Sequence, residues 1–203
     1  MTLQKPISAL RRQAEKQNDS VEGGMFWRLM DFLIYLLLTM LVVFSIRSVL
    51  IDPIRVKGSS MLDTLKEEEI MLVNRLSYTF DQPKTGDIVI CYYPDTYYEI
   101  RNKEYNSRVK RVLANAGDTI EAYDGKVYVN GAALEEPYLT ERRIGNLTIE
   151  KQTVPEGCCY VLGDNRAVSI DSRDPDVGPI PYNHIIGKVK MVLFPLQKLR
   201  FVK

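Results

Sequence analysis

Apolar residues follow two patterns along the chain, and the first is a single long run near the start. The segment FLIYLLLTMLVVFSI, residues 32–46, contains no charged side chain. As a helix it would rise only about 22 Å, which is short of the roughly 30 Å of a bilayer core. The run can be extended if Arg28, Asp31 and Arg47 lie near the interfaces, where long side chains reach water. We therefore predict one transmembrane helix over residues 25–51.

Two other interpretations of this run fit less well. A cleaved signal peptide needs small residues just after its apolar core, whereas here the chain continues as IRSVLIDPIRV. A helix buried in a soluble core would carry a polar stripe, which this run lacks. Residues 1–24 are polar and have no apolar period, so they are predicted to be a flexible tail.

The basic residues that flank the run favour a cytoplasmic N-terminus. They are Lys5, Arg11, Arg12, Lys16 and Arg28 before the run, and Arg47, Arg55 and Lys57 after it. This orientation places residues 52–203 on the extracytoplasmic side of a cell membrane that the chain crosses once.

The second pattern begins after the run, where short stretches rich in Val, Ile and Tyr are separated by turns that contain Gly or Asp. Examples are IRVKGS, EEIMLVNRL, DIVICYY, RVKRVL, KVYVNG and CCYVLG. Such spacing predicts an antiparallel, mainly β domain over residues 52–203. The stretch AYDGKVYVNG is typical of a hairpin with an Asp-Gly turn. After residue 65 the one helical turn that we expect lies near PYNH.

Composition narrows the function only slightly. The net charge is +1, and charged residues make up 26% of the chain, so there is no basic excess of the kind that nucleic-acid binding requires. The cysteines are Cys91, Cys158 and Cys159, with no CxxC motif, which argues against a structural zinc site. We expect them to be small buried hydrophobic residues. Whether Cys91 reaches Cys158 or Cys159 is left open by the sequence.

The stretch GSSMLDTL, residues 58–65, raises the question of a nucleophile. If residues 54–60 are extended, alternate side chains share a face, so Ser60 lies with Ile54 and Val56 while Ser59 lies with Arg55 and Lys57. Ser60 is then the better candidate, because it would sit beside an apolar cleft. Two ordinary turn serines remain the alternative. The one histidine of the chain, His184, lies far along the sequence in PYNHIIG and is interpreted as a loop residue.

Four separated motifs, in order, resemble the bacterial type I signal peptidases. The apolar anchor is followed by GSSMLDTL, which is similar to the family's Gly-x-Ser-Met-x-Pro-Thr-Leu. RVKRVLANAGDTIE is similar to its Lys-Arg box and Pro-Gly-Asp. GDNRAVSIDSR, residues 163–173, matches the signature Gly-Asp-Asn-Arg-x-x-Ser-x-Asp-Ser-Arg at every defined position, and GPIP follows at residues 178–181.

The resemblance implies an antiparallel β catalytic domain of the signal peptidase and LexA-like kind, with a Ser-Lys dyad that needs no metal or cofactor. Ser60 aligns with the nucleophile and Lys110 with the general base, which must be neutral to accept a proton and therefore needs a pKa below its usual value of roughly 10.4. The Ser60 backbone N–H would stabilise the oxyanion. Gly58 stands where some relatives place a second, hydroxyl donor, so that donor is missing or Gly58 only allows close backbone approach. Ser169 aligns with a serine that orients the lysine.

Further roles follow from the same resemblance. The charged residues of the last motif are expected to support the site, with an ion pair between the last two of them: Asp164, Arg166, Asp171 and Arg173. Candidate substrate-binding residues, which would line small pockets, are Ile54, Val56 and Met61. The implied substrates are secretory preproteins, cut after small residues in the Ala-x-Ala manner and bound as an added β-strand. The expected partners are these preproteins and a lipid bilayer, with no nucleic acid, and we expect a monomer.

Departures from the family pattern keep a second function open. Asp63 stands where proline is usual, and Ala114 and Ala116 stand where Gly and Pro are common. Loss of the proline removes a rigid residue after the nucleophile. A membrane-anchored binding or scaffold protein with impaired catalysis is therefore the alternative.

Two other Ser-Lys enzymes fit less well. Penicillin-binding and β-lactamase-like enzymes use Ser-x-x-Lys followed by Lys-Thr-Gly. Ser107 and Lys110 give the first motif, but Lys-Thr-Gly comes earlier in the chain, at residues 84–86. A self-cleaving regulator would carry a DNA-binding part and no membrane anchor.

Overall fold

The computed structural model of the chain describes residues 24–25, 27–45, 51–95, 97 and 107–202. The chain divides into two compact units, Met1–Ser48 and Val49–Lys203, which we describe separately. The predicted tail, residues 1–24, lies outside the described residues except for Gly24.

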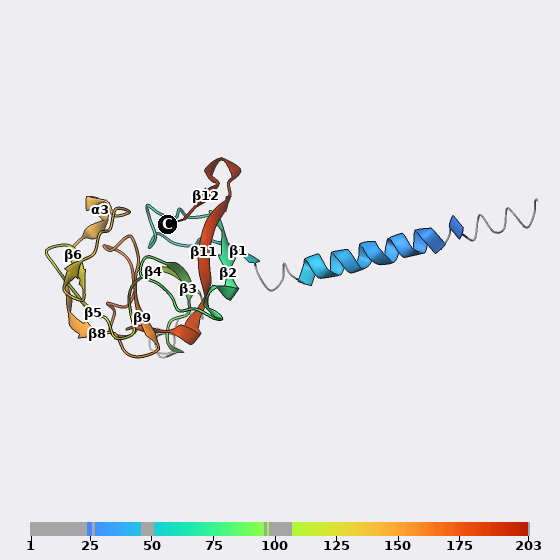
Figure 1. Ribbon diagram of the computed structural model, residues 1–203. Coiled ribbons are helices and arrows are strands. Elements are labelled where there is room, and N and C mark those ends of the chain that lie inside the picture. The colour runs from blue at the N-terminus through green and yellow to red at the C-terminus, as the bar shows by residue number, and fades with distance from the viewer. Residues whose placement is uncertain (1–23, 26, 46–50, 96, 98–106, 203) are drawn as a thin grey trace, which may run out of the picture. The chain divides into compact units, whose positions relative to one another are not determined.

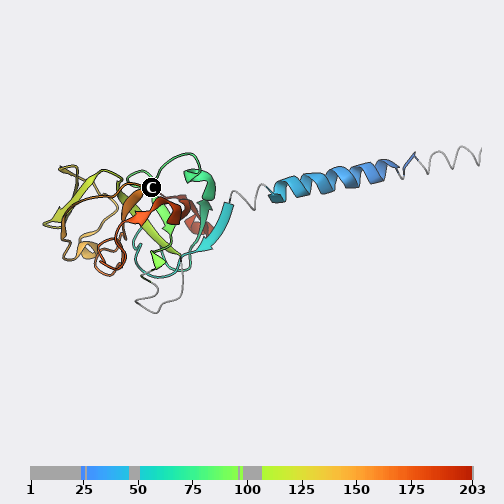
Figure 2. The same cartoon turned by 90° about the horizontal axis from the view of Figure 1, so that it is seen from below.

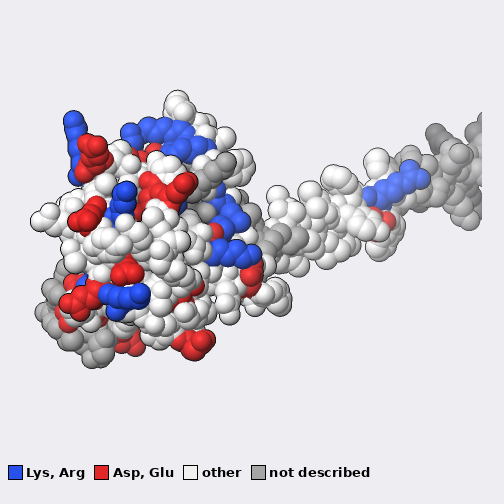
Figure 3. Space-filling model, turned by 60° about the vertical axis from the view of Figure 1, so that its left-hand side comes forward, with Lys and Arg blue, Asp and Glu red and all other residues white. Residues whose placement is uncertain are grey.

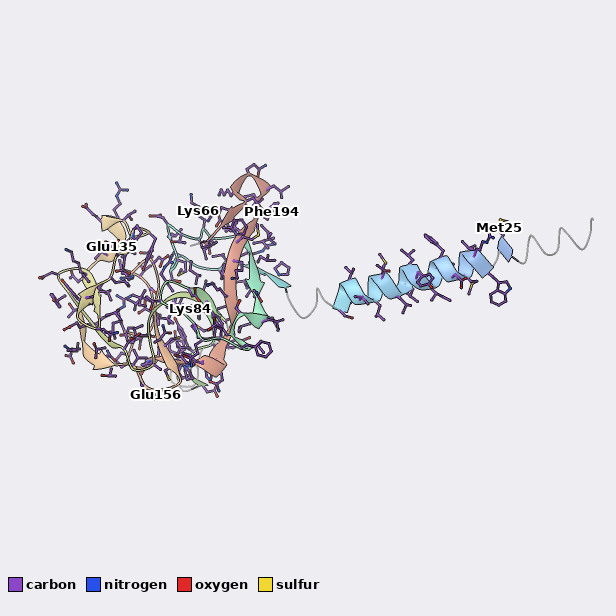
Figure 4. All side chains as sticks on the ribbon, in the orientation of Figure 1. Met25, Lys66, Lys84, Glu135, Glu156 and Phe194 are labelled. Carbon is purple, nitrogen blue, oxygen red and sulfur yellow. The ribbon has the colours of Figure 1, made fainter. Side chains whose placement is uncertain are left out.

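The first unit contains an apolar helix over Trp27–Ser45. Its apolar side chains project all around the helix (Figure 4) and are exposed. Among the described residues, it is the one helix long and apolar enough to cross a membrane. Ile51, predicted to be the last residue of the span, instead begins the first strand of the second unit.

The second unit is built on a large antiparallel sheet that follows the order β1-β2-β11-β3-β4-β9-β10, with β12 paired to β11 (Figure 1). The strand bounds are β1 Ile51–Arg55, β2 Ile70–Asn74, β3 Ile88–Cys91, β4 Arg108–Asn115, β9 Cys158–Leu162, β10 Ile180–Pro181, β11 Ile185–Phe194 and β12 Arg200–Phe201. Every neighbouring pair is antiparallel. The mainly β, antiparallel fold class predicted from the sequence is therefore confirmed.

A smaller antiparallel sheet, in the order β7-β6-β5-β8, lies to one side of β4 and β9 in both ribbon views (Figures 1 and 2). Its strands are β5 Thr119–Tyr123, β6 Lys126–Val129, β7 Ala132–Ala133 and β8 Ile149–Thr153. Asp124 and Gly125 join β5 to β6 with φ values of 49° and 74°. Positive φ at both central residues is what a two-residue hairpin turn requires, so the predicted hairpin is confirmed.

The helical segments of the second unit whose bounds lie in the described residues are short. They are η1 Arg75–Tyr78, α3 Glu141–Ile144, η2 Tyr182–His184 and η3 Leu196–Lys198. The turn expected near PYNH corresponds to η2. The other three were not predicted, because a segment of three or four residues is too short to show a helical period.

Central strands of the large sheet are covered on both faces. All residues of β3 are buried, and they alternate between two apolar clusters. Val89 and Cys91 pack with Val112 and Val161, whereas Ile88 and Ile90 pack with Met71 and Val189 in the other cluster. This two-sided burial makes β3 and its neighbour β4 a rigid base for the residues that β4 presents.

The surface carries charges of both signs. On the face shown in Figure 3, lysine and arginine side chains are interspersed with aspartate and glutamate side chains. This mixture agrees with the nearly balanced net charge of +1.

Candidate active site

Ser60 lies in a tight turn that follows β1. The strand ends at Arg55, and Gly58 has a φ of +84°, a left-handed conformation that glycine adopts without strain. The loop of residues 163–166 holds the turn from the other side: the Asn165 N–H donates to the Ser60 carbonyl at 2.9 Å, and its side-chain amide donates to the Ser59 carbonyl at 3.0 Å. The position of the hydroxyl is therefore set by two separate segments.

Lys110 comes from β4, in the middle of the large sheet. Its side chain is almost fully buried, with 2% exposed, and its Nζ is hydrogen bonded to Ser60 Oγ at 2.8 Å. Burial disfavours the ammonium form and lowers the pKa of Lys110 from its ordinary 10.5 to about 8, although the nearby carboxylate of Asp171 opposes this change. Neutral amine is thus more abundant near neutral pH than for an ordinary lysine, and it lies directly beside a hydroxyl.

A donor for a developing oxyanion is also present. The Ser60 N–H donates to no acceptor among the described residues, so it is available to a ligand in the turn. The Gly58 N–H instead donates to Glu67 Oε1 at 3.2 Å. Gly58 therefore supplies the backbone conformation of the turn, and its side chain offers no second donor.

Ser169 lies next to the turn without a hydrogen bond to Lys110. Its Oγ donates to the Ile170 carbonyl at 3.4 Å, and the two described side chains Ser169 and Lys110 share no hydrogen bond. Ser169 packs where Gly163 leaves room, since a Cβ at position 163 would lie 2.2 Å from Ser169 Oγ and 2.6 Å from the Ser60 carbonyl oxygen. The direct contact predicted between Ser169 and the lysine is absent here, because the hydroxyl is turned toward its own backbone.

Asp171 and Arg173 form a salt bridge with two hydrogen bonds beneath the site. Arg173 Nε donates to Asp171 Oδ1 at 2.7 Å, and Nη2 donates to Oδ2 at 2.9 Å. Asp171, which is fully buried, also accepts the Gly163 N–H at 3.0 Å. This pair ties the two ends of the loop that carries Ser169.

Asp164 has a partner that sequence reasoning did not single out. Arg111 Nε donates to Asp164 Oδ1 at 2.9 Å and Nη2 to Oδ2 at 2.8 Å, with both side chains buried. Arg111 also donates to the Gly86 carbonyl at 3.0 Å and lies over the Tyr138 ring. Its place directly after Lys110 in RVKRV was the available signal, because two adjacent strand residues point to opposite faces and both here are charged.

Arg166 and Thr64 complete the network. Arg166 donates to the Gly163 carbonyl at 3.0 Å and pairs with Glu136. Thr64 Oγ1 donates to Asp164 Oδ2. The motifs at residues 58–65 and 163–173, together with the Lys-Arg pair of β4, are therefore assembled around one point.

A cleft of about 640 Å³ opens at Ser60 and Lys110. Its lining residues are Pro53, Ile54, Arg55, Lys57, Gly58, Ser59, Ser60, Tyr93, Tyr97, Ser107, Arg108, Val109, Lys110, Val168 and Ile170. Of the three predicted substrate-binding residues, Ile54 lines the cleft. Val56 and Met61 do not: they are 2% and 1% exposed and belong to the apolar core. That prediction was wrong for both, because their side chains pack in the core with Leu65, Met71 and Val73.

Other candidates from the sequence lie elsewhere. His184 ends η2 and does not line the cleft. Lys84, of the Lys-Thr-Gly match, pairs with Asp81 at the surface. Cys91 and Cys159 are buried free thiols, and burial raises the pKa of Cys91 to about 12. The thiols therefore behave as small hydrophobic residues.

Comparison with known proteins gives consistent results. The sequence model of the family described as signal peptidase, peptidase S26, matches residues 29–194. Signal peptidase I of Bacillus caldolyticus is 35% identical over 158 residues, which cover 72% of this chain and 81% of the relative. Signal peptidase I T of Bacillus subtilis (strain 168) is 32% identical over 211 residues, which cover 100% of both chains. The chloroplastic thylakoidal processing peptidase 1 of Arabidopsis thaliana is 35% identical over 156 residues, but the match spans 75% of this chain and only 45% of that longer protein.

Proposed function

This chain belongs to the signal peptidase family, peptidase S26, and is a type I signal peptidase; we propose that it removes signal peptides from secreted preproteins with Ser60 as nucleophile and Lys110 as general base. The observation that carries this proposal is the 2.8 Å contact between Lys110 Nζ and Ser60 Oγ. Nucleophile and base within hydrogen-bond reach are the geometric requirement for covalent catalysis. The lowered pKa of the buried amine, about 8, supplies the neutral base.

Acylation is the first half of the proposed reaction. Neutral Lys110 takes the hydroxyl proton as Ser60 Oγ attacks the scissile carbonyl carbon. The carbonyl oxygen becomes an oxyanion that the Ser60 N–H can stabilise, as preorganised donors do in acyl transfer. The tetrahedral intermediate collapses, Lys110 gives its proton to the leaving amine, and the mature protein departs. The signal peptide remains as an ester on Ser60.

Deacylation repeats the same proton transfers with water. Lys110, neutral again, takes a proton from a water molecule that attacks the ester carbonyl. Collapse of the second intermediate returns the proton to Ser60 Oγ and releases the signal peptide. All of these transfers occur between groups of this chain, the substrate and water.

The substrate is proposed to lie as an extended strand in the cleft beside β1. This strand is at the edge of the large sheet, paired only with β2 among the described strands, and an edge strand offers free backbone groups to a bound peptide. Ile54 and Val109 both line the cleft. Their side chains are suited to form the walls of pockets for the small residues one and three positions before the cut. This arrangement would account for cleavage after Ala-x-Ala.

Membrane attachment completes the proposal. The helix Trp27–Ser45 is proposed to be a single-pass anchor, with the N-terminal tail in the cytoplasm and residues 52–203 outside. The catalytic unit would then meet preproteins as they emerge from the membrane.

The test is cleavage of an Ala-x-Ala preprotein by the detergent-solubilised protein, with the Ser60→Ala variant beside it. We expect the parent to release the mature protein and the variant to lose at least about a thousandfold in rate, as happens when a nucleophile is removed. Circular dichroism of both proteins serves as the control for folding. Equal cleavage by the folded variant would reject Ser60 as nucleophile.

A further inference from the structure

Arg108 is a cleft residue for which the reaction described above has no use. It lies on β4, two residues before Lys110, and lines the cleft. Its Nε is buried and has no hydrogen-bond partner among the described residues. A guanidinium carries five N–H donors and no acceptor, and a buried donor without a partner costs free energy. The described part of the chain thus leaves this donor without an acceptor.

The charged side chains that line the cleft, among the residues the structure describes, are all basic. They are Arg55, Lys57, Arg108 and Lys110. Arg55 is already paired with Glu68 at 2.6 Å, and Lys110 is the proposed base. Arg108 is the remaining cation with a buried donor, since Lys57 is exposed.

Strand geometry places Arg108 along the path of the substrate. Successive antiparallel pairings β1-β2-β11-β3-β4 make β1 and β4 run in the same direction. Residues 53–59 lead to Ser60, and residues 107–109 lead to Lys110, so both sides of the cleft converge on the two proposed catalytic residues. Two residues of strand span about 7 Å, and Arg108 and Lys110 share a face. Arg108 therefore faces substrate residues a few positions from the scissile bond.

We propose that Arg108 determines specificity by binding the carboxylate of an aspartate or glutamate two or four residues before the scissile bond. This inference rests on the proposed function, which assigns positions one and three to small residues. An arginine pairs with a carboxylate through two parallel N–H···O bonds. Partial burial of the guanidinium, as at Arg108, makes such a pair stronger than a fully exposed one.

Peptide binding to the Ser60→Ala protein tests the inference without requiring cleavage. The probes are signal-peptide segments with alanine one and three residues before the cut, and with aspartate or asparagine at position two or position four. We expect the aspartate peptide to bind at least about tenfold more tightly at one of these positions, because two charge-assisted hydrogen bonds together exceed the free energy of that ratio. Adding Arg108→Gln should remove the difference, and Arg108→Glu should reverse it in favour of a lysine peptide.

Matched variants distinguish a specific effect of Arg108 from a general effect of positive charge on peptide binding. Lys126→Gln removes an exposed cation of β6 outside the cleft and should leave the preference intact. Equal binding of aspartate and asparagine peptides at both positions would overturn the inference. A preference that survives Arg108→Gln but is lost with Lys57→Gln would overturn it as well. The parent's cleavage of the asparagine peptide is measured separately, so failure of the proposed function is recognised on its own.

Discussion

At the scale of single residues, the site depends on a lysine that the fold keeps in an unfavourable place. Lys110 is 2% exposed, and burial of an ammonium without a carboxylate in contact is costly. The only hydrogen bond of its Nζ among the described residues goes to Ser60 Oγ. The protein therefore gives up stability to hold a base whose pKa is about 8, well below its ordinary value of 10.5.

This cost leads to a prediction for Lys110→Met, which fills similar space without a charge. Below pH 8 the lysine is protonated in both the folded and the unfolded protein, so the full cost of its burial is present. As pH rises from about 8, the folded pKa, toward the unfolded value of about 10.4, the cost disappears. We expect the free energy of unfolding at pH 7 to be roughly 1–3 kcal/mol higher for the variant than for the parent.

The measurement is urea denaturation of both proteins at pH 7 and pH 10. The advantage of the variant should shrink at the higher pH. A variant that is less stable than the parent at pH 7 would show that burial of the Lys110 amine does not lower the free energy of unfolding.

Sequence reasoning singled out Ser60 and Lys110, which the structure brings within 2.8 Å of each other, and missed the residues that hold them. Ser60 and Lys110 stand in short motifs that can be compared position by position. Arg111 and Asn165 were not singled out, because their roles depend on hydrogen bonds between segments about 50 and 100 residues apart. Arg108 begins the motif RVKRVLANAGDTIE but was given no role there, and only the folded cleft shows that its Nε lacks a partner among the described residues.

At the scale of elements, the site is a junction between a turn, a strand and a loop. The turn after β1 carries Ser60, β4 carries Lys110 and Arg111, and the loop of residues 163–173 is attached to both. Arg111 joins the strand to the loop through Asp164, and Asn165 joins the loop to the turn. Alternation predicted the individual strands well, but it failed after Arg55, since Gly58 at a φ of +84° redirects the chain. A sequence pattern of period two carries no information beyond such a residue.

The Arg111–Asp164 pair is predicted to matter for stability more than any exposed ion pair of the domain. Arg111→Ala leaves a buried carboxylate without its partner, which costs about 3–5 kcal/mol of unfolding free energy. The exposed pair of Arg55 with Glu68 provides the matched control, since Arg55→Gln should cost less than about 1 kcal/mol.

Urea denaturation at pH 7 measures the free energy of unfolding of Arg111→Ala and of Arg55→Gln. Equal, small losses for the two would contradict the structural role assigned to Arg111.

At the scale of the whole molecule, the two units differ in the surface they expose. The apolar residues of Trp27–Ser45 are exposed, which suits a helix surrounded by lipid. Residues 52–203 form a domain with its own cores. The sequence predicted this division from one apolar run followed by short β stretches, although it placed Ile51 in the span when that residue belongs to β1.

Orientation gives a prediction for intact cells. Protease added outside should degrade residues 52–203 and leave the anchor and tail, because we propose that the catalytic unit is extracytoplasmic. A tag on the N-terminus should resist the protease until the membrane is opened. Protection of the catalytic unit in intact cells would reverse the proposed orientation.

The central claim is that neutral Lys110 activates Ser60, and the pH dependence of Ser60 acylation tests it most directly. The rate of covalent labelling by an acylating peptidase inhibitor is followed by intact mass, with the parent and the Lys110→Met variant compared. Because the base acts only when deprotonated, we predict a rate that rises with pH, is half-maximal near pH 8 and is lost in the variant. Labelling that is independent of pH, or that persists at the parent's rate in Lys110→Met, would contradict the account.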